Sequence, residues 1–317
     1  MTALLPLFLL ILGFAALILG ANWLVNGAIS VGVKAKLSPL IIGLTIVAFG
    51  TSLPELIVNI FSCIKGSPGV AIGNIIGSNT MNILLILGAS SMIYPIEVSR
   101  ISIRRDIPAG FVATLAITLM ANDFFRGTSR TIDWIEGIVL LLMGAGYLYL
   151  TFKKNLEFSD GSETHSDSPW GKTIFQLILG IIGLYIGGEL VSNNVQKLAL
   201  SLGMSEGTVG LTVVATATSL PELITSIVAA LKKNSAIAIG NVLGSNILNI
   251  FIVLGVSALI TPLPFDTKMN QQLLILFASN AIMLTTVFTG KSRKISRFEG
   301  AVLTLGYVAF ILFSLYY

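Results

Sequence analysis

The feature that most restricts the fold of this chain is the recurrence of apolar stretches of about 20 residues along its whole length. Each stretch is long enough to cross roughly 30 Å of hydrocarbon as a helix. Only 11% of the 317 residues are charged, against about 25% in soluble domains, so the chain could not cover its own surface in water. Because a helix satisfies its backbone hydrogen bonds internally, the sequence predicts an all-α integral membrane protein.

Charged residues, prolines and glycines divide the apolar sequence into ten predicted transmembrane helices. The first apolar run begins without a basic segment, and no small-residue cleavage site follows it, so it is interpreted as a membrane helix and not a signal peptide. The predicted spans cover residues 4–25, 39–63, 69–92, 107–122, 133–152, 171–196, 207–231, 236–260, 271–289 and 298–316.

The positions of lysine and arginine predict the orientation of these spans. If both termini are extracellular, the loops on the inner side hold 14 of the 19 basic residues. Such an excess is typical of cytoplasmic loops. We therefore expect a multi-pass protein of the plasma membrane, with a cytoplasmic linker at 153–170. The acidic residues at the span ends, Asp106, Asp123 and Asp133, are expected to be solvated.

The chain also contains an internal duplication. With an offset of 167 residues, 43–90 align without a gap to 210–257, and 26 of the 48 positions are identical. Since each half holds five predicted spans, an odd number, the second half must enter the membrane from the opposite side. The sequence thus predicts two inverted five-helix repeats, 1–152 and 171–317. Many secondary transporters are built this way, with the substrate site at the repeat interface, but channels can be too, so symmetry leaves the transport mode open.

Two acidic residues fall inside predicted spans at the same repeat position. Glu55 lies about 16 residues into the second span, and Glu222 lies about 15 residues into the seventh. A carboxylate at membrane depth costs at least a few kcal/mol unless it is paired, hydrated or protonated, so it indicates a functional site. No lysine or arginine lies in the interior of a predicted span to pair with either carboxylate.

Prolines and polar residues surround both glutamates. Pro54 and Pro221 precede them and open the preceding helical turn, which frees carbonyls near 48–51 and 215–218. Gly73-x-x-x-Gly77 and Gly240-x-x-x-Gly244 predict close helix approach. This would bring the polar residues that follow these glycines beside the Pro-Glu segments. The side-chain oxygens then available belong to Thr51, Ser52, Ser78, Asn82, Thr218, Ser219, Ser245 and Asn249.

Carboxylate, carbonyl, hydroxyl and amide oxygens are ligands of hard cations such as calcium and sodium. Two ionised carboxylates supply a charge of −2, which one divalent cation, two or three monovalent cations, or two protons would neutralise. Mutually exclusive occupation of one such site is a sufficient basis for antiport, and it does not say which ions compete. The single Cys63 and the single His165 form no cluster, so no zinc or redox-metal site is expected.

The duplicated motifs G-T-S-x-P-E and G-S-N-x-x-N, with ten spans and a central linker, resemble the calcium/cation antiporter superfamily, and within it the sodium/calcium exchangers. The resemblance covers the whole chain. It implies sodium moving inward and calcium outward by alternating access, as the first and sixth helices slide across the rest. It identifies Glu55 and Glu222 as calcium-ligating acids. It also implies that Ala48 and Ala215 contribute main-chain carbonyls. Its other ion-site positions are Thr51, Thr218, Ser52, Ser219, Ser78, Ser245, Asn82 and Asn249.

Two positions depart from the family pattern. Ala217 stands where the first half has Gly50, which restricts the backbone beside one sodium position. Asn249 stands where some relatives have aspartate, and in the potassium-dependent branch that acid is tied to potassium use, so the resemblance favours potassium independence. Proton-coupled relatives usually carry a G-N-A-x-E type motif in place of T-S-x-P-E, which favours sodium coupling.

Three other functions were weighed against the sodium/calcium antiporter. Calcium/proton antiport would use the same two carboxylates as proton acceptors. A passive cation channel would need a permeation filter, and nothing in the sequence resembles one. An intramembrane hydrolase would need a base beside Ser52 or Ser219, and no His, Lys or Asp accompanies them at membrane depth. We therefore expect no enzyme activity, no cofactor, no nucleic acid and no obligate protein partner, only the lipid bilayer and the transported calcium and sodium ions.

Overall fold

The structure, a computed structural model, describes residues 4–124, 130–158, 168–201, 215–289 and 293–316, and nearly all of them are helical. The helices are α1 (Leu4–Ala35), α2 (Pro39–Ile42), α3 (Ala48–Thr51), α4 (Leu53–Ile64), α5 (Gly69–Met81), α6 (Leu87–Ile93), α7 (Ile107–Ala121), α8 (Trp134–Phe158), α9 (Trp170–Ser201), α11 (Ala215–Thr218), α12 (Leu220–Leu231), α13 (Ser235–Leu248), α14 (Gly255–Ile260), α15 (Met269–Thr289) and α16 (Arg297–Tyr316), with the π-helical segments η1 (Gly43–Val47), η2 (Asn82–Ile86), η3 (Ser102–Asp106) and η5 (Asn249–Leu254).

The prediction of an all-helical membrane protein is confirmed. Within the described ranges, six helical stretches are long and apolar enough to cross a bilayer, or seven if α2–α3 and α4, which meet at a 41° bend, form one span. Large apolar side chains such as Leu5, Ile11 and Leu142 are more than 60% exposed, whereas Glu55 and Glu222 are fully buried. A surface of this kind suits lipid and not water.

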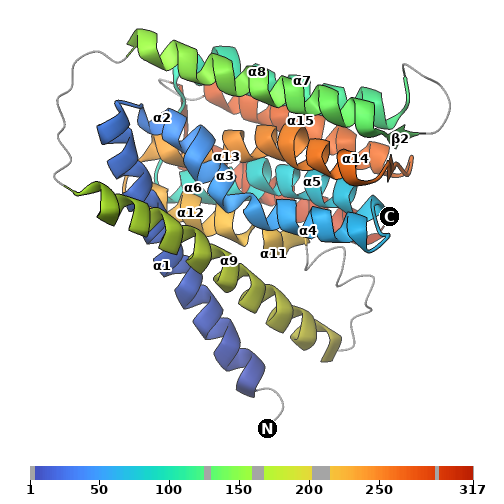
Figure 1. Cartoon of the computed structure of the whole chain (residues 1–317), viewed down its shortest axis with the longest axis horizontal. Helices are drawn as coiled ribbons and strands as arrows, with labels where there is room; N and C mark the ends of the chain where they lie inside the picture. The colour runs from blue at the N-terminus through green and yellow to red at the C-terminus, as the bar shows by residue number, and fades with distance from the viewer. Residues whose placement is uncertain (1–3, 125–129, 159–167, 202–214, 290–292, 317) are drawn as a thin grey trace.

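Helices α1 and α9 lie side by side and run obliquely across the remaining helices (Figure 1). Glycines allow this close contact: a Cβ on Gly20 would lie 2.7 Å from the backbone nitrogen of Leu184, and one on Gly180 would lie 2.6 Å from that of Leu24. Helix α1 continues to Ala35, beyond the predicted end at residue 25. These extra turns hold several polar residues and are packed against α9, where the Ser30 hydroxyl hydrogen-bonds that of Thr173 at 2.8 Å.

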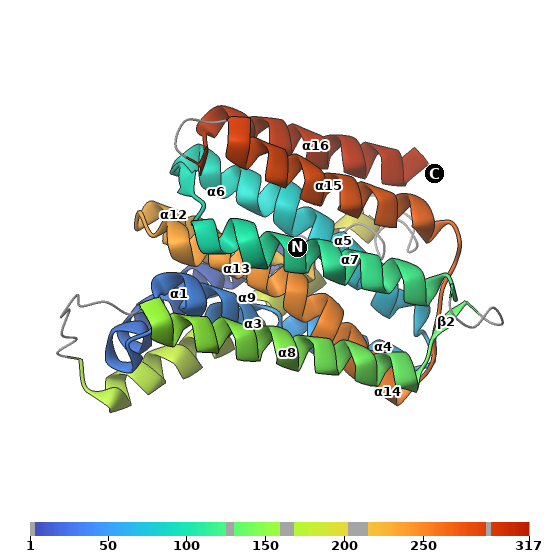
Figure 2. The same ribbon diagram turned by 90° about the horizontal axis from the view of Figure 1, so that it is seen from above.

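The other helices form a bundle in which α13 lies near the middle, with α15 and α16 along one side and α8 towards the opposite side (Figure 2). Helix α8 runs on to Phe158, past the predicted linker start at residue 153. Residues 159–167, which are half of that linker, lie outside the described part of the chain, as do residues 207–214 of the predicted seventh span.

Two short antiparallel ribbons join the halves of the chain, a feature that the all-helical prediction did not include. Strand β1 (Ile96–Glu97) pairs with β4 (Lys294–Ile295), and β2 (Thr131–Ile132) pairs with β3 (Leu263–Pro264). In each ribbon one strand comes from the first half and the other from the second. An exposed ion pair between Glu97 and Lys294 accompanies the first ribbon.

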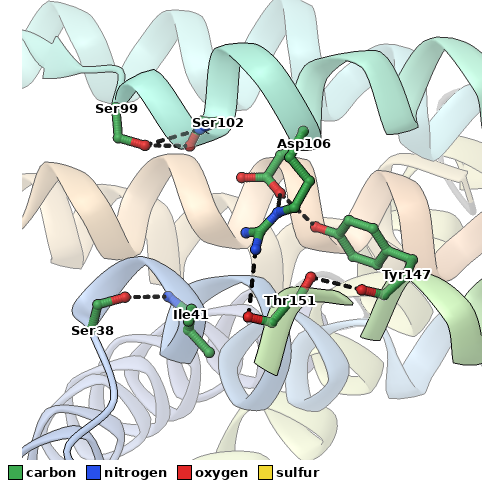
Figure 3. Close-up of polar contacts among 8 residues, drawn as sticks. Ser38, Ile41, Ser99, Ser102, Asp106, Tyr147 and Thr151 are labelled. Atoms are coloured by element: carbon green, nitrogen blue, oxygen red, sulfur yellow. Dashed lines mark hydrogen bonds and ion pairs between the residues drawn. The ribbon is translucent and has the colours of Figure 1, made fainter. Parts of the chain in front are cut away.

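Asp106 was expected to be solvated, and this prediction is wrong, because its side chain is fully buried; Asp123 is only 9% exposed as well. The Asp106 carboxylate accepts hydrogen bonds from the Arg105 Nε at 2.6 Å and from the Tyr147 hydroxyl at 3.2 Å. Figure 3 shows Asp106, the last residue of η3, facing Tyr147 on α8, with Thr151 on the same helix nearby. Arg105 also donates to the Thr151 carbonyl at 3.4 Å. The charged η3 segment that leads into α7 is therefore fixed to α8 by the hydrogen bonds of Asp106 with Tyr147 and of Arg105 with Thr151.

Replacing Asp106 by leucine should lower the thermal unfolding temperature of the purified protein. The change leaves the Arg105 charge without its partner, and breaking a buried ion pair in this way costs about 3 kcal/mol. The control is Asp266→Asn, because Asp266 lies on the exposed surface and its change should be nearly neutral. Equal unfolding temperatures for both variants would contradict a stabilising role for the Arg105–Asp106 pair.

Candidate functional site

The two T-S-L-P-E blocks form the same broken helix twice. Ser52 separates α3 from α4 with φ −84° and ψ 5°, and Ser219 separates α11 from α12 with φ −88° and ψ 5°. These angles lie in the sparsely allowed bridge region, next to helical geometry. The breaks follow from Pro54 and Pro221, which lack the N–H that would bond the carbonyl four residues earlier.

Each glutamate lies in the first turn of the helix that follows the break and accepts a hydrogen bond from the opposite half of the chain. The Ser219 hydroxyl donates to Glu55 Oε1 at 3.1 Å, and the Ser52 hydroxyl donates to Glu222 Oε1 at 3.0 Å. The Oε2 atom of each glutamate is buried without a hydrogen-bond partner. An ionised carboxylate in this position is stable only when a cation or a proton neutralises it.

Four more buried oxygens in the same region lack hydrogen-bond partners among the described residues. They are the hydroxyls of Ser78 and Ser245 and the Oδ1 atoms of Asn82 and Asn249. Each pair is related by the 167-residue repeat, as the two glutamates are. The elements that carry them, α4, α5, α12, α13, η2 and η5, contact one another. Buried oxygens of this mixture suit calcium or sodium.

Two further asparagines orient the amides of Asn82 and Asn249. Asn79 and Asn246 each donate to the backbone carbonyl of the other, at 3.0 and 3.2 Å. The Asn246 Oδ1 accepts from Asn82 Nδ2 at 2.9 Å, and the Asn79 Oδ1 accepts from Asn249 Nδ2 at 3.2 Å. The nitrogens of Asn82 and Asn249 are thereby engaged, which leaves their oxygens for a ligand. The π-helical segments η2 and η5 begin at Asn82 and Asn249, and such segments are frequent at functional sites.

The threonines of the repeated motif are buried and held across the repeat interface. Thr51 Oγ1 lies 3.1 Å from Asn241 Oδ1 and 3.2 Å from the Ala48 carbonyl oxygen. Thr218 donates to Asn74 Oδ1 at 3.2 Å. The sequence predicts that the Ala48 carbonyl is freed, but it accepts from the backbone N–H of Ser52 at 3.0 Å, which uses one of its two lone pairs. Ala215 is the first residue of α11, and its side chain lies outside the described part.

Four buried asparagines of the site were not predicted from the sequence: Asn74, Asn79, Asn241 and Asn246. All four lie in the repeated G-N-x-x-G-S-N block, so identity between the two halves was the signal that could have found them. Among the described residues, no group of three or more His, Cys, Asp or Glu side chains comes together. The negative charge of the site therefore comes from two carboxylates, and neutral oxygens supply its other polar contacts.

Comparison with known proteins agrees with this geometry. The sequence model of the family described as "Sodium/calcium exchanger protein" matches residues 5–153 and 172–316. This chain belongs to the sodium/calcium exchanger family. The sodium/calcium exchanger MaX1 of Methanosarcina acetivorans is 31% identical over 97% of this chain and 98% of its own length. The CaxA protein of Alkalimonas amylolytica is 35% identical over 96% of this chain and 97% of its own.

Solved structures of the sodium-calcium exchanger NCX_Mj, soaked with sodium and strontium or calcium, have the same fold as this family member. One of them, soaked with 10 mM sodium and 10 mM strontium, superimposes with a TM-score of 0.83, at 32% sequence identity over 98% of both chains. The family relationship makes the present chain a cation antiporter. Its multi-pass membrane character follows from the same relatives and from its apolar helices.

Proposed function

We propose that this family member exchanges calcium for sodium by alternating access, through one site between the two halves of the chain. The observation that carries the proposal is the set of six buried, unpartnered oxygens on Glu55, Glu222, Ser78, Ser245, Asn82 and Asn249. One calcium ion neutralises the two carboxylates, and two or three sodium ions do so in its place. Because the two occupancies exclude each other, sodium entering from one side displaces calcium towards the other.

In this proposal all the residues nominated from the sequence contribute oxygens to the bound ions. Calcium lies between the two glutamates and is approached by the hydroxyls of Thr51 and Thr218. The remaining oxygens serve sodium or flank the centre, and they come from the carbonyls of Ala48 and Ala215 and from the side chains of Ser52, Ser219, Ser78, Ser245, Asn82 and Asn249.

The proposed topology has ten spans in two inverted repeats, 1–152 and 171–317, with extracellular termini, in the plasma membrane. The strand pairing supports this topology. β1 and β4 lie in loops predicted to be cytoplasmic, and β2 and β3 lie in loops predicted to be extracellular. A miscounted span would place paired strands on opposite sides of the bilayer.

The two halves of the proposed site are not identical. A Cβ on Gly50 would lie 3.2 Å from Ile181 on α9, whereas the repeat-related Ala217 already carries a buried methyl group. We propose that the sodium position beside Ala217 is less adaptable than its counterpart. The neutral Asn249 supports transport that is independent of potassium.

The test is calcium uptake into proteoliposomes that contain the purified protein. Vesicles loaded with sodium and diluted into sodium-free medium should accumulate calcium, and vesicles loaded with choline should not. Equal uptake under both conditions would contradict sodium coupling. Uptake driven by a pH gradient in the absence of sodium would instead establish calcium/proton antiport, and ionic conductance without counter-transport would establish a channel.

A further inference from the structure

Two asparagines outside the proposed ligand set, Asn74 and Asn241, contact the threonines of the opposite half. We infer that they are positioning residues that accept the hydroxyl protons of Thr218 and Thr51 and so direct the threonine oxygens at the cation. The inference rests on the proposed cation site, and it adds a layer of residues that sets the affinity of that site. The direction of each hydrogen bond follows from which atoms can donate and which can only accept.

The orientation of Asn241 is fixed by a backbone carbonyl. Its amide lies 3.3 Å from the Glu222 carbonyl oxygen and 2.9 Å from the Ser226 hydroxyl. A carbonyl only accepts, so the atom facing it must be Nδ2, and Oδ1 must face Thr51. Since Oδ1 also only accepts, the Thr51 hydroxyl is the donor in the 3.1 Å contact. Both Asn241 and Thr51 are completely buried, so no bulk water competes for these atoms.

The orientation of Asn74, in the first half, is also fixed by a backbone carbonyl, but through a second side chain, that of Asn59. Asn59 donates to the Ala71 carbonyl at 3.3 Å, which turns its own Oδ1 towards Asn74. Asn74 donates to that oxygen at 2.9 Å. Its remaining oxygen then accepts from Thr218 at 3.2 Å. The three hydrogen bonds therefore run in one direction, from Thr218 through Asn74 and Asn59 to the main-chain carbonyl of Ala71.

The direction of the threonine proton decides how many oxygens a cation can use. A hydroxyl has a single proton, and the acceptors within reach of the Thr51 proton are Asn241 Oδ1, the Ala48 carbonyl and the Glu222 carboxylate. When Asn241 takes it, Ala48 keeps one lone pair free beside the Ser52 N–H bond. The Thr51 hydroxyl is the donor in each of these contacts, so its two lone pairs can face the cation. Holding these oxygens ready before the ion arrives removes part of the cost of ordering them on binding.

The two halves differ in the residue behind each asparagine, because Asn59 and Ser226 occupy the same repeat position. Asn241 has a direct bond to the Glu222 carbonyl, so the loss of Ser226 leaves it anchored. Asn74 reaches a backbone carbonyl only through Asn59. Asn59→Ala should therefore weaken cation binding more than Ser226→Ala does.

The experiment is a double-mutant cycle on calcium affinity, measured by calorimetry on the full-length protein in detergent. Asn241→Leu and Thr51→Val should each weaken calcium binding roughly tenfold, about the worth of one contact to a charged group. The double variant should be no weaker than Thr51→Val alone, because Asn241 acts through that hydroxyl. The equivalent cycle with Asn74→Leu and Thr218→Val serves if Asn241→Leu or Thr51→Val fails to fold.

A purely structural role for the asparagines predicts a different result. The two losses would then multiply to roughly a hundredfold, and Ser226→Ala would weaken binding as much as Asn59→Ala. Either outcome overturns the inference while sodium-driven uptake by the unmodified protein still supports the proposed function. Conversely, the cycle can be non-additive while calcium flux does not depend on sodium. That combination would contradict the proposed exchange and still support the positioning role.

Discussion

Glu55→Gln and Glu222→Gln should each abolish sodium-driven calcium uptake. Both carboxylates are fully buried and lie on helices that begin at the same kind of break. Removing one unit of charge about 4 Å from a cation costs about 4 kcal/mol at an effective dielectric constant near 20. That loss corresponds to roughly a thousandfold weaker binding. Glutamine also presents an amide that can point its hydrogens at the ion.

Uptake should be measured in proteoliposomes with matched protein content, and calcium binding in detergent. Glu97→Gln is the control, because this carboxylate is exposed and pairs with Lys294 at the first ribbon. We expect it to transport at the unmodified rate. If either site variant retained uptake within a few-fold of the control, its glutamate could not be a ligand of the transported cation.

The helical membrane class could be predicted from the sequence because it depends on stretch length and on backbone hydrogen bonding, which are local properties. The ends of α1 and α8 could not be predicted from the sequence. Asn26 and Ser30 look like the end of a span, yet α1 continues to Ala35 because α9 packs beside it. The burial of Asp106 was missed for the same reason, since Tyr147 and Thr151 come from a helix distant in sequence.

More of the candidate site than of the helix ends could be predicted, because the duplication marks the same site residues in both halves of the chain. The glutamates, prolines and hydroxyls stand out, since each is costly in a membrane helix without a partner. The asparagines that hold Thr51 and Thr218 did not stand out. Their role comes from hydrogen-bond directions set by the carbonyls of Glu222 and Ala71, and no spacing in the sequence encodes those directions.

Gly244→Val should lower both the unfolding temperature and the calcium affinity. A Cβ on Gly244 would lie 2.6 Å from the Leu44 carbonyl oxygen and 2.7 Å from the Ala48 Cβ. These neighbours are backbone atoms and a methyl group fixed to the backbone, so they cannot move aside by rotating. Overpacking of this kind costs about 1–3 kcal/mol, and more where the backbone must shift.

The same substitution should also disturb the ion site, because Gly244 holds α13 against η1 and α3. Separating these elements would lengthen the contact between Thr51 and Asn241, now 3.1 Å. Gly146→Val on the exposed face of α8 is the matched control, since nothing lies within 4 Å of its Cβ position. Unfolding in detergent and calorimetry with calcium measure the two effects. A Gly244 variant as stable and as tightly binding as the Gly146 variant would show that the site tolerates a wider gap between the repeats. The close approach of the two repeated blocks would then not be what holds the cation oxygens in place.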